Sequence, residues 1–266
     1  MVRMVNKSNE ADFIRVLSCN PLFGATIRAN YDVYGQDARY LSLWLVYDEQ
    51  AQPHMVVQYY QETLTLCCAP EDDDVTFFAS FLSIAPPWRS IIGPERMVSS
   101  LPPRVTDGRG MRTGSVMVFD GAPVEFAPPK GTQSVIKLNY RSLFTLLGEC
   151  SDEYKNRADY HHWYTDLSYR MRHGGVRVTA LKADGLYASS ASAYISGGIA
   201  VVRDVCTLTD KRGRGYAKAV VFELCHSLHA DGIRPYLLSV SPEADSLYHK
   251  SGFRVQSLWA ALYNNV

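Results

Sequence analysis

Residues 205–218 (VCTLTDKRGRGYAK) combine the residue types that bind a phosphate group. A β-branched stretch leads into a turn with two glycines, and an amphipathic helical pattern begins directly after it. Glycine lacks a Cβ, so the backbone at Gly213 and Gly215 can approach a ligand closely. The first amides of a helix have no intrahelical partner and lie at the positive end of its dipole. The segment therefore predicts a diphosphate site at the start of the helix. Further positive charge comes from Arg212, Arg214 and Lys218.

Two motifs in the second half of the chain resemble a known family. Arg212, Gly215 and Ala217 give the order Arg-x-x-Gly-x-Ala after an apolar strand, which resembles the acyl-CoA loop of the GNAT superfamily of N-acyltransferases. A second run, residues 244–253 (ADSLYHKSGF), is similar to the A-x-x-L-Y-x-K-x-G-F run of that family. The resemblance covers the chain from about Leu138 to its C-terminus.

The resemblance implies an α/β fold, with a mixed, mostly antiparallel sheet flanked by helices. The first half lacks both motifs, but its strand–strand–strand–helix order resembles a degenerate copy of the same fold. We therefore expect a tandem arrangement. Residues 1–130 would form the degenerate domain with a proline- and glycine-rich linker, and residues 131–266 the domain that binds acyl-CoA.

The resemblance also implies acetyl-CoA as co-substrate and no metal. The pantetheine arm would pair with the strand around residues 205–207, which would splay from the strand at residues 236–240. The amine would attack the thioester directly in a ternary complex, without a covalent enzyme intermediate. The residues expected to bind the cofactor are Val205, Cys206, Thr207, Arg212, Gly213, Arg214, Gly215, Tyr216, Ala217 and Lys218.

Tyr248 occupies the tyrosine position of the second motif, and the resemblance implies that it protonates the leaving thiolate. The alternative is that Tyr248 only packs against the cofactor. The general base stays open between a water chain, Asp204, Glu243 and Tyr194. The strand after the glycine-rich helix ends in Ser239-Val240-Ser241, where the family often has Asn, so an ordered amine site there does not follow.

The elements that position these residues follow from periodicity. In the second half we expect helices over 141–150, 152–172 (one helix or two), 215–230 and 242–250, and strands over 176–181, 186–195, 199–207 and 236–240, with a last strand from Phe253. In the first half we expect helices over 10–17, 23–34 and 75–82, and strands over 41–47, 55–60, 63–68, 90–92 and 116–119. Residues 85–130 hold eight of the 13 prolines, so long regular elements are not expected there.

Other motifs have simpler interpretations. The adjacent His161 and His162 point to different helix faces and lack a third ligand, so a metal site is not predicted. Residues 108–115 are similar to a phosphate loop but lack its lysine and preceding strand, which favours an ordinary linker. Cys206 is expected to be a packed thiol and not a nucleophile. Trp163 and Tyr164 belong to an aromatic group that mainly packs, although the resemblance also allows contact with the acceptor.

The composition excludes several classes. Lys and Arg total 27 and Asp and Glu total 27, so zero net charge gives no reason to expect a nucleic-acid or membrane partner. Six cysteines without a CxxC pair, and no apolar leader in the first residues, indicate a reduced, cytoplasmic protein. No apolar stretch reaches the length of a transmembrane helix.

The acceptor is expected to be an amine, first on a small molecule and second on a protein. The oligomeric state stays open, a homodimer included, as do the acyl-chain preference and any ligand of the first half. The rival interpretations are a catalytically weak or inactive sensor or structural protein that binds acyl-CoA, and an unrelated α/β protein with a chance loop.

Overall fold

A computed structural model describes residues 1–35, 41–121, 127–156 and 158–264 of the 266-residue chain. Two compact units can be separated by their internal packing. The N-terminal unit contains Met1–Val116, Leu238–Ser241 and Val255–Val266. The C-terminal unit contains Met117–Leu237 and Pro242–Arg254. The domain boundary that the sequence predicts near residue 130 stays a prediction.

The N-terminal unit is built around one sheet with the strand order β1-β2-β3-β4-β5-β12. Strands β2, β3 and β4 form an antiparallel meander, and β4 and β5 run parallel. The bounds are β1 (Val2–Met4), α1 (Glu10–Leu17), α2 (Pro21–Tyr34), β2 (Leu41–Tyr47), β3 (Pro53–Tyr60), β4 (Thr63–Cys67), α3 (Thr76–Phe81), β5 (Ser90–Pro94), α4 (Glu95–Ser99), α5 (Pro103–Thr106), β6 (Arg109–Phe119) and β12 (Phe253–Asn264). All helices and strands predicted in this half are present, and α1 and β2 have the predicted bounds.

The C-terminal unit contains a sheet with the order β11-β10-β9-β8-β7. Strands β8, β9 and β10 form an antiparallel meander, whereas β10 and β11 run parallel. The bounds are β7 (Thr132–Ser134), α6 (Tyr140–Cys150), α7 (Asp152–Asn156), α8 (Tyr160–Arg172), β8 (Val176–Ala183), β9 (Leu186–Ser196), β10 (Ile199–Thr207), a 3-10 turn (Thr209–Lys211), α9 (Tyr216–Ala230), β11 (Arg234–Ser239) and α10 (Pro242–His249). The predicted helical region 152–172 is two helices.

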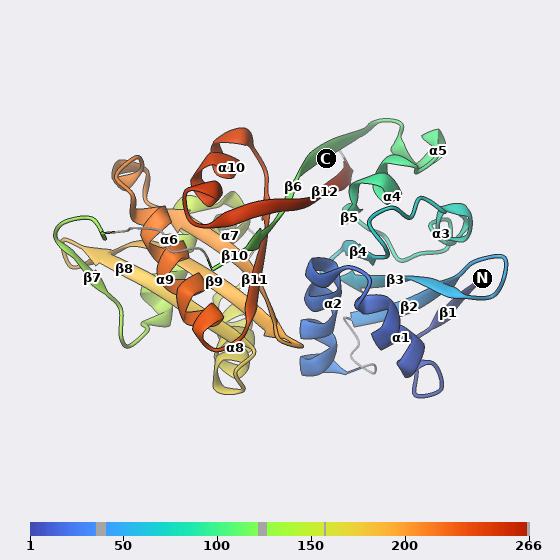
Figure 1. Ribbon diagram of the computed structural model, residues 1–266, viewed down its shortest axis with the longest axis horizontal. Coiled ribbons are helices and arrows are strands. Elements are labelled where there is room, and N and C mark those ends of the chain that lie inside the picture. The colour runs from blue at the N-terminus through green and yellow to red at the C-terminus, as the bar shows by residue number, and fades with distance from the viewer. Residues whose placement is uncertain (36–40, 122–126, 157, 265–266) are drawn as a thin grey trace. The chain divides into compact units, whose positions relative to one another are not determined.

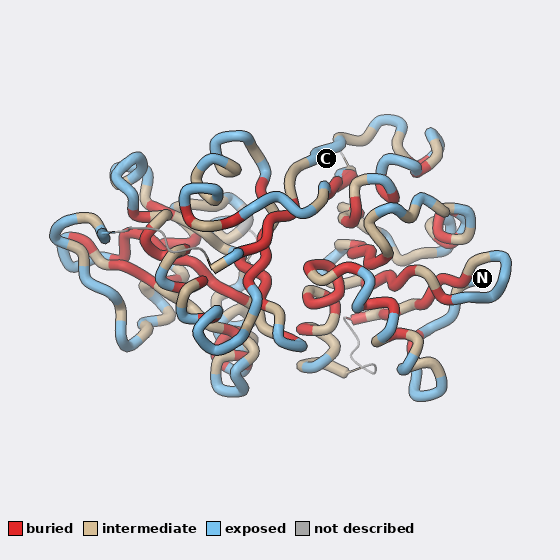
Figure 2. The backbone as a smooth tube through the Cα atoms, viewed as in Figure 1, coloured by how far each residue is buried: buried red, intermediate tan, exposed pale blue. Residues whose placement is uncertain are grey.

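Helices cover both faces of this second sheet (Figure 1). Helix α9 packs apolar side chains such as Val220 and Leu224 against Ala191, Ala193 and Val202 of the strands. Helices α6 and α8 contribute to a separate apolar cluster on Val176, Ala180 and Tyr187. In Figure 2 the residues drawn in red, which are buried, lie mainly along these strands. Side chains that alternate along β9 and β10 therefore face two different helical layers.

Local chemistry explains why these elements begin and turn where they do. Asn139 and Asp159 cap α6 and α8, because their side-chain oxygens accept from Ser142 N at 2.9 Å and from His162 N at 2.8 Å. The hairpin turn between β8 and β9 has positive φ at both Asp184 (54°) and Gly185 (81°). Such a turn matches the twist of the two strands that it joins.

The two halves of the chain repeat one order of elements. Each half runs strand, helices, three-stranded meander, helix, parallel strand, helix, and a final strand, so β4, α3 and β5 correspond to β10, α9 and β11. The sheet, its helical layers and the repeat confirm the predicted fold class.

Strand β12 belongs to the N-terminal sheet, although it is the last strand of the chain. It pairs antiparallel with β5, with Ala260 opposite Gly93 and Leu262 opposite Ile91. Ala260 and Leu262 are buried in the apolar core of that unit. The Trp259 Nε1–H donates to the Ser239 carbonyl at 2.9 Å. The N-terminal unit therefore needs residues from the far end of the chain.

The prediction of a linker over residues 108–115 was wrong, because β6 runs from Arg109 to Phe119. Glycine at position 114 has a packing role there. A Cβ on Gly114 would lie only 2.1 Å from the Ser239 carbonyl oxygen and 2.7 Å from the Trp259 ring nitrogen. Glycine thus marks a close approach of two chain segments within a strand, and not an irregular loop.

Candidate functional site

A cavity of about 520 Å³ in the C-terminal unit brings together most of the residues predicted to do chemistry. Strand β10, the turn after it, the first residues of α9, one residue of α6 and two residues of α10 form its wall. The lining residues are Cys150, Val205, Cys206, Thr207, Lys211, Arg212, Gly213, Gly215, Tyr216, Ala217, Lys218, Leu247 and Tyr248. Among the residues predicted to bind the cofactor only Arg214, which is exposed, is not part of this wall, and the candidate bases Asp204, Glu243 and Tyr194 also lie outside it.

Strand β10 supplies one side of the cavity after a β-bulge. It pairs with β11 over residues 199–202 and with β9 along its length, and the β9 register shifts between Arg203 and Cys206. Asp204 in the bulge has φ of +53°, in the left-handed region. The bulge interrupts the regular ladder immediately before Val205, where the strand begins to line the cavity.

The glycine-rich turn has the backbone conformation that its glycines allow. Gly213 and Gly215 have φ of +73° and +85°, which residues with a Cβ rarely adopt. Gly215 is also the N-cap of α9, so no side-chain oxygen at this cap occupies the first-turn amides. The Arg212 Nε–H donates to the Thr207 carbonyl at 3.2 Å and fixes the turn against β10. The turn therefore presents a glycine-capped helix end to the cavity.

Lys211 is a cavity residue that the sequence analysis did not select. Its ammonium donates to Asp184 Oδ2 at 2.9 Å, and Asp184 belongs to the β8–β9 turn. This hydrogen bond raises the pKa of Lys211, and the same bond lowers the pKa of Asp184. Cys150 and Leu247 were also missed. Leu247 lies inside the second motif and was within reach of sequence reasoning, whereas Cys150 comes from a helix more than 50 residues earlier.

Tyr248 projects from α10 into the same cavity. Its ring packs edge-on against Phe253 with centroids 5.8 Å apart, and it borders the apolar core under α9. Burial, followed by the nearby Cys225 thiol, raises the pKa of Tyr248 to about 12. The phenol is therefore protonated at neutral pH and available as a hydrogen-bond donor.

The candidates for a base lie in different surroundings. The Tyr154 hydroxyl donates to Asp204 Oδ1 at 3.1 Å, which holds the bulge carboxylate against α7. Tyr194 is enclosed beside Arg203, and burial followed by the Asp204 charge raises its pKa far above the usual value. Glu243 is exposed in the first turn of α10. A phenolate at Tyr194 is thus strongly disfavoured. Asp204 is a partly buried carboxylate on β10, one residue before Val205, where the strand begins to line the cavity.

The corresponding loop of the N-terminal unit, residues 68–75 between β4 and α3, has the opposite charge. It carries four consecutive acids, Glu71 to Asp74. The Asp74 carboxylate accepts from Thr76 N at 3.0 Å, and this backbone hydrogen bond lowers the pKa of Asp74. The helix start that faces a cavity in the C-terminal unit is here covered by carboxylates, which would repel a diphosphate.

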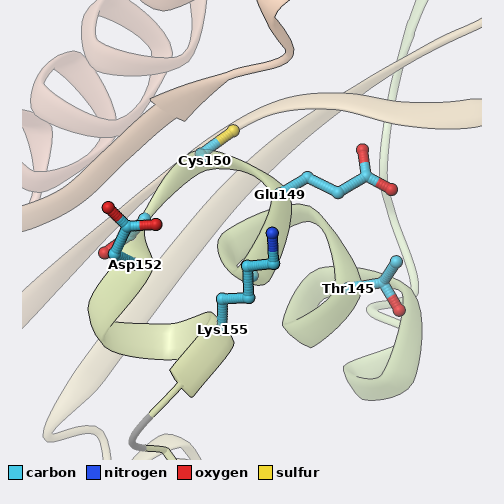
Figure 3. A pocket seen from close by; sticks show the side chains of 7 residues that line it. Thr145, Glu149, Cys150, Asp152 and Lys155 are labelled. Atoms are coloured by element: carbon cyan, nitrogen blue, oxygen red, sulfur yellow. The ribbon is translucent and has the colours of Figure 1, made fainter.

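A second cavity, of about 570 Å³, lies where α6 ends and α7 begins (Figure 3). Its wall contains side chains of both charges, among them Glu149, Asp152 and Lys155. Cys150 lines both cavities, so the two adjoin at that residue.

The aromatic residues of α8 pack only in part, because Tyr160 and Trp163 are half-buried whereas Tyr164 and Tyr169 are exposed. Trp163 lies against Phe144 with ring centroids 5.0 Å apart, in the cluster under α6. Tyr164 stacks on Tyr160 and is 40% exposed. His161 and His162 are both exposed on α8. Over the described ranges, no group of three or more His, Cys, Asp or Glu residues is placed to hold a metal ion.

No helix within the described part of the chain is both long and apolar enough to cross a membrane.

Comparisons with known proteins agree on one fold. Residues 147–258 match the family model described as "Acetyltransferase (GNAT) domain". A GCN5-related N-acetyltransferase from Sphaerobacter thermophilus is 14% identical with a TM-score of 0.68, over 98% of this chain and 94% of that one. A tandem GNAT protein from the clavulanic acid biosynthesis pathway is 12% identical with a TM-score of 0.60, over 98% of this chain and 97% of that one. A GCN5-related N-acetyltransferase-like protein from Streptococcus suis is 19% identical with a TM-score of 0.58, over 95% of this chain and 98% of that one. No curated protein sequence matches the chain.

Proposed function

Because residues 147–258 form a GNAT acetyltransferase domain within a fold like that of a tandem GNAT protein, we propose that the protein transfers an acetyl group from acetyl-CoA to a primary amine. The observation that carries this proposal is the single cavity that joins the glycine-rich turn, the end of β10 and Tyr248. A diphosphate at the turn and a thioester near Tyr248 would then be the two ends of one ligand. The fold alone would not distinguish this function, because folds host many chemistries.

The turn would hold the diphosphate by backbone amides and by charge. Gly213 and Gly215 leave room for close approach, and the α9 dipole favours an anion at this end. Lys211, Arg212 and Lys218 add positive charge on the cavity wall. Val205 to Thr207 would pair with the pantetheine amides, as a further strand pairs with an exposed backbone edge.

Tyr248 would assist departure of the thiolate. Its phenol is protonated at neutral pH, and its pKa is raised further, to about 12. A phenol with so high a pKa is a weak acid, so we assign it a hydrogen bond to the developing thiolate, with proton transfer only as the sulfur becomes negative. The amine would attack directly, and the protein would supply orientation.

Asp204 is the base that the geometry favours over Tyr194. It lies on β10 immediately before the cavity residues, and its carboxylate has a hydrogen-bond donor in Tyr154 at 3.1 Å. A carboxylate can take the proton of the attacking ammonium directly or through one water. The buried phenol of Tyr194 cannot easily become a phenolate.

The acceptor would approach from the second cavity, which adjoins the first at Cys150. The carboxylates of Glu149 and Asp152 suit a cationic amine, and Lys155 suits a second, anionic group. We therefore rank a small polar amine first and a protein amine second.

Calorimetric titration with coenzyme A, followed by measurement of thiol release from acetyl-CoA with a panel of amines, tests the proposal. Binding with amine-dependent thiol release is the expected result. Binding without turnover on any amine would favour a sensor or structural protein that binds acyl-CoA, and no binding would contradict the proposal.

A further inference from the structure

Two thiols in the wall of the first cavity have no role in the proposed transfer. Cys150 is the last residue of α6, Cys206 lies in the second half of β10, and both are free and line the cavity. Helix α6 packs directly on β10, and the side chains of Cys150 and Cys206 interact with each other, so the two thiols are neighbours in this wall. The Ser190 hydroxyl lies 3.2 Å from the Cys206 sulfur.

The packing of α6 on β10 holds this pair in place. Both cysteines border the apolar cluster that contains Leu146 and Leu147 of α6. Figure 3 shows the Cys150 sulfur pointing away from the Lys155 ammonium of the second cavity. The two thiols therefore lie where the end of a helix meets a cavity strand, and a disulfide there would join α6 to β10.

We propose that Cys150 and Cys206 are a redox-active thiol pair, which a small-molecule disulfide converts into an intramolecular disulfide in the cavity wall. A second part of the proposal, which rests on the proposed function, is that this disulfide weakens binding of coenzyme A. Forming the bond brings the sulfurs to about 2.05 Å. It would draw the end of α6 toward the segment of β10 that lines the cavity. By thermodynamic linkage, bound coenzyme A would in turn oppose formation of the disulfide.

The chemistry proceeds by two thiol–disulfide exchanges. The Cys150 thiolate attacks one sulfur of the small-molecule disulfide, forms a mixed disulfide and releases the first small thiol. The Cys206 thiolate then attacks the Cys150 sulfur, forms the protein disulfide and releases the second small thiol. The two protein thiols lose two electrons and two protons, and the two released thiols carry them.

Cys150 is the better first nucleophile. Burial raises the pKa of Cys150, but the hydrogen bond from Cys206 and the charge of Arg212 act in the opposite direction. Burial raises the pKa of Cys206 to about 12, which leaves little thiolate there. Attack at Cys150 and resolution by Cys206 follow from this difference.

The test uses the full chain with oxidised glutathione as probe. After alkylation of the remaining thiols, peptide mass mapping is expected to show a peptide that links Cys150 to Cys206. Cys19→Ser, which removes an exposed thiol of the N-terminal unit, should form the same link. Cys150→Ser and Cys206→Ser should each fail to form it. Glutathione attached to either cysteine without any Cys150–Cys206 link in the parent protein would overturn the proposal.

Titration of coenzyme A into the reduced and the oxidised protein separates the two parts. We expect at least tenfold weaker binding after oxidation, restored by a reductant. Equal affinity in both states would overturn the second part of the proposal, that the disulfide weakens binding of coenzyme A. If the reduced protein does not bind coenzyme A, the proposed function fails. Peptide mapping of the Cys150–Cys206 link still tests the redox-active thiol pair in that case.

Discussion

The Tyr154 hydroxyl donates to the carboxylate of Asp204 at 3.1 Å, and Asp204 has a left-handed backbone in the bulge of β10. The bulge thus places an acid directly before the strand segment that lines the cavity. Asparagine tolerates the left-handed region well, so one substitution can remove the charge and keep the backbone.

Asp204→Asn should keep the fold and the affinity for coenzyme A, but lower turnover by roughly 10²–10⁴-fold, the contribution typical of a general base. Steady-state kinetics with an accepted amine measures the change. Tyr154→Phe is the matched control, because it removes the hydrogen bond and keeps the carboxylate. That variant should lower turnover far less than Asp204→Asn does. Unchanged turnover in Asp204→Asn would exclude Asp204 as the base.

Gly215→Glu should abolish binding of coenzyme A. The new side chain is strained at φ of +85° and places an anion where the diphosphate is proposed to bind. Gly232→Glu is the control, since Gly232 also has positive φ (74°) and has open space around it, but lies at the far end of α9. Calorimetry should show parent-like affinity for the control. Retained affinity in Gly215→Glu would count heavily against the site.

Tyr248→Phe should lower turnover while changing affinity for coenzyme A by less than about threefold, because the ring that packs on Phe253 remains. Comparison of kcat with the calorimetric Kd measures the split. A parallel loss of affinity with unchanged kcat would show that Tyr248 only packs against the ligand.

Tyr248 also predicts a dependence of stability on alkaline pH. Its folded pKa of about 12 lies above the ordinary value of 10.0, so the fold favours the neutral phenol. This contribution is complete below pH 10 and is lost as the pH rises toward 12, up to about 2–3 kcal/mol. Denaturant unfolding across that range should show a shallower loss for Tyr248→Phe than for the parent. Equal slopes would mean that Tyr248 titrates normally.

Leu262→Ala on β12 should destabilise the protein by about 2–5 kcal/mol, because it opens a cavity in the N-terminal core. Leu258→Ala on the same strand is the control. Leu258 is 54% exposed, so its truncation should cost less than about 0.5 kcal/mol. Similar losses in both variants would contradict the integration of β12 into the N-terminal unit.

Much of this architecture could be predicted from the sequence because the signals are local. Periodicity gave the bounds of α1, β2 and β10, and the spacing of Arg212, Gly215 and Ala217 indicated a turn that does line a cavity. Tyr248 follows from the second motif in the same way. In these segments the residue types and their spacing along the chain are sufficient to predict the element or the site residue.

Features that depend on distant contacts could not be predicted. Gly114 looks like a loop residue until Trp259 and the Ser239 carbonyl are seen to leave no room for a Cβ. The approach of Cys150 to Cys206 depends on how α6 packs on β10. Likewise, the bulge at Asp204 arises from the register of β9 and β10, which no local pattern specifies.

The most direct test of the central claim is a crystal structure of the protein with coenzyme A bound. The proposal predicts the diphosphate against the backbone of residues 213–218, with pantetheine along Val205 to Thr207 and its sulfur near Tyr248. Coenzyme A bound elsewhere, with this turn covered by other chain, would contradict it.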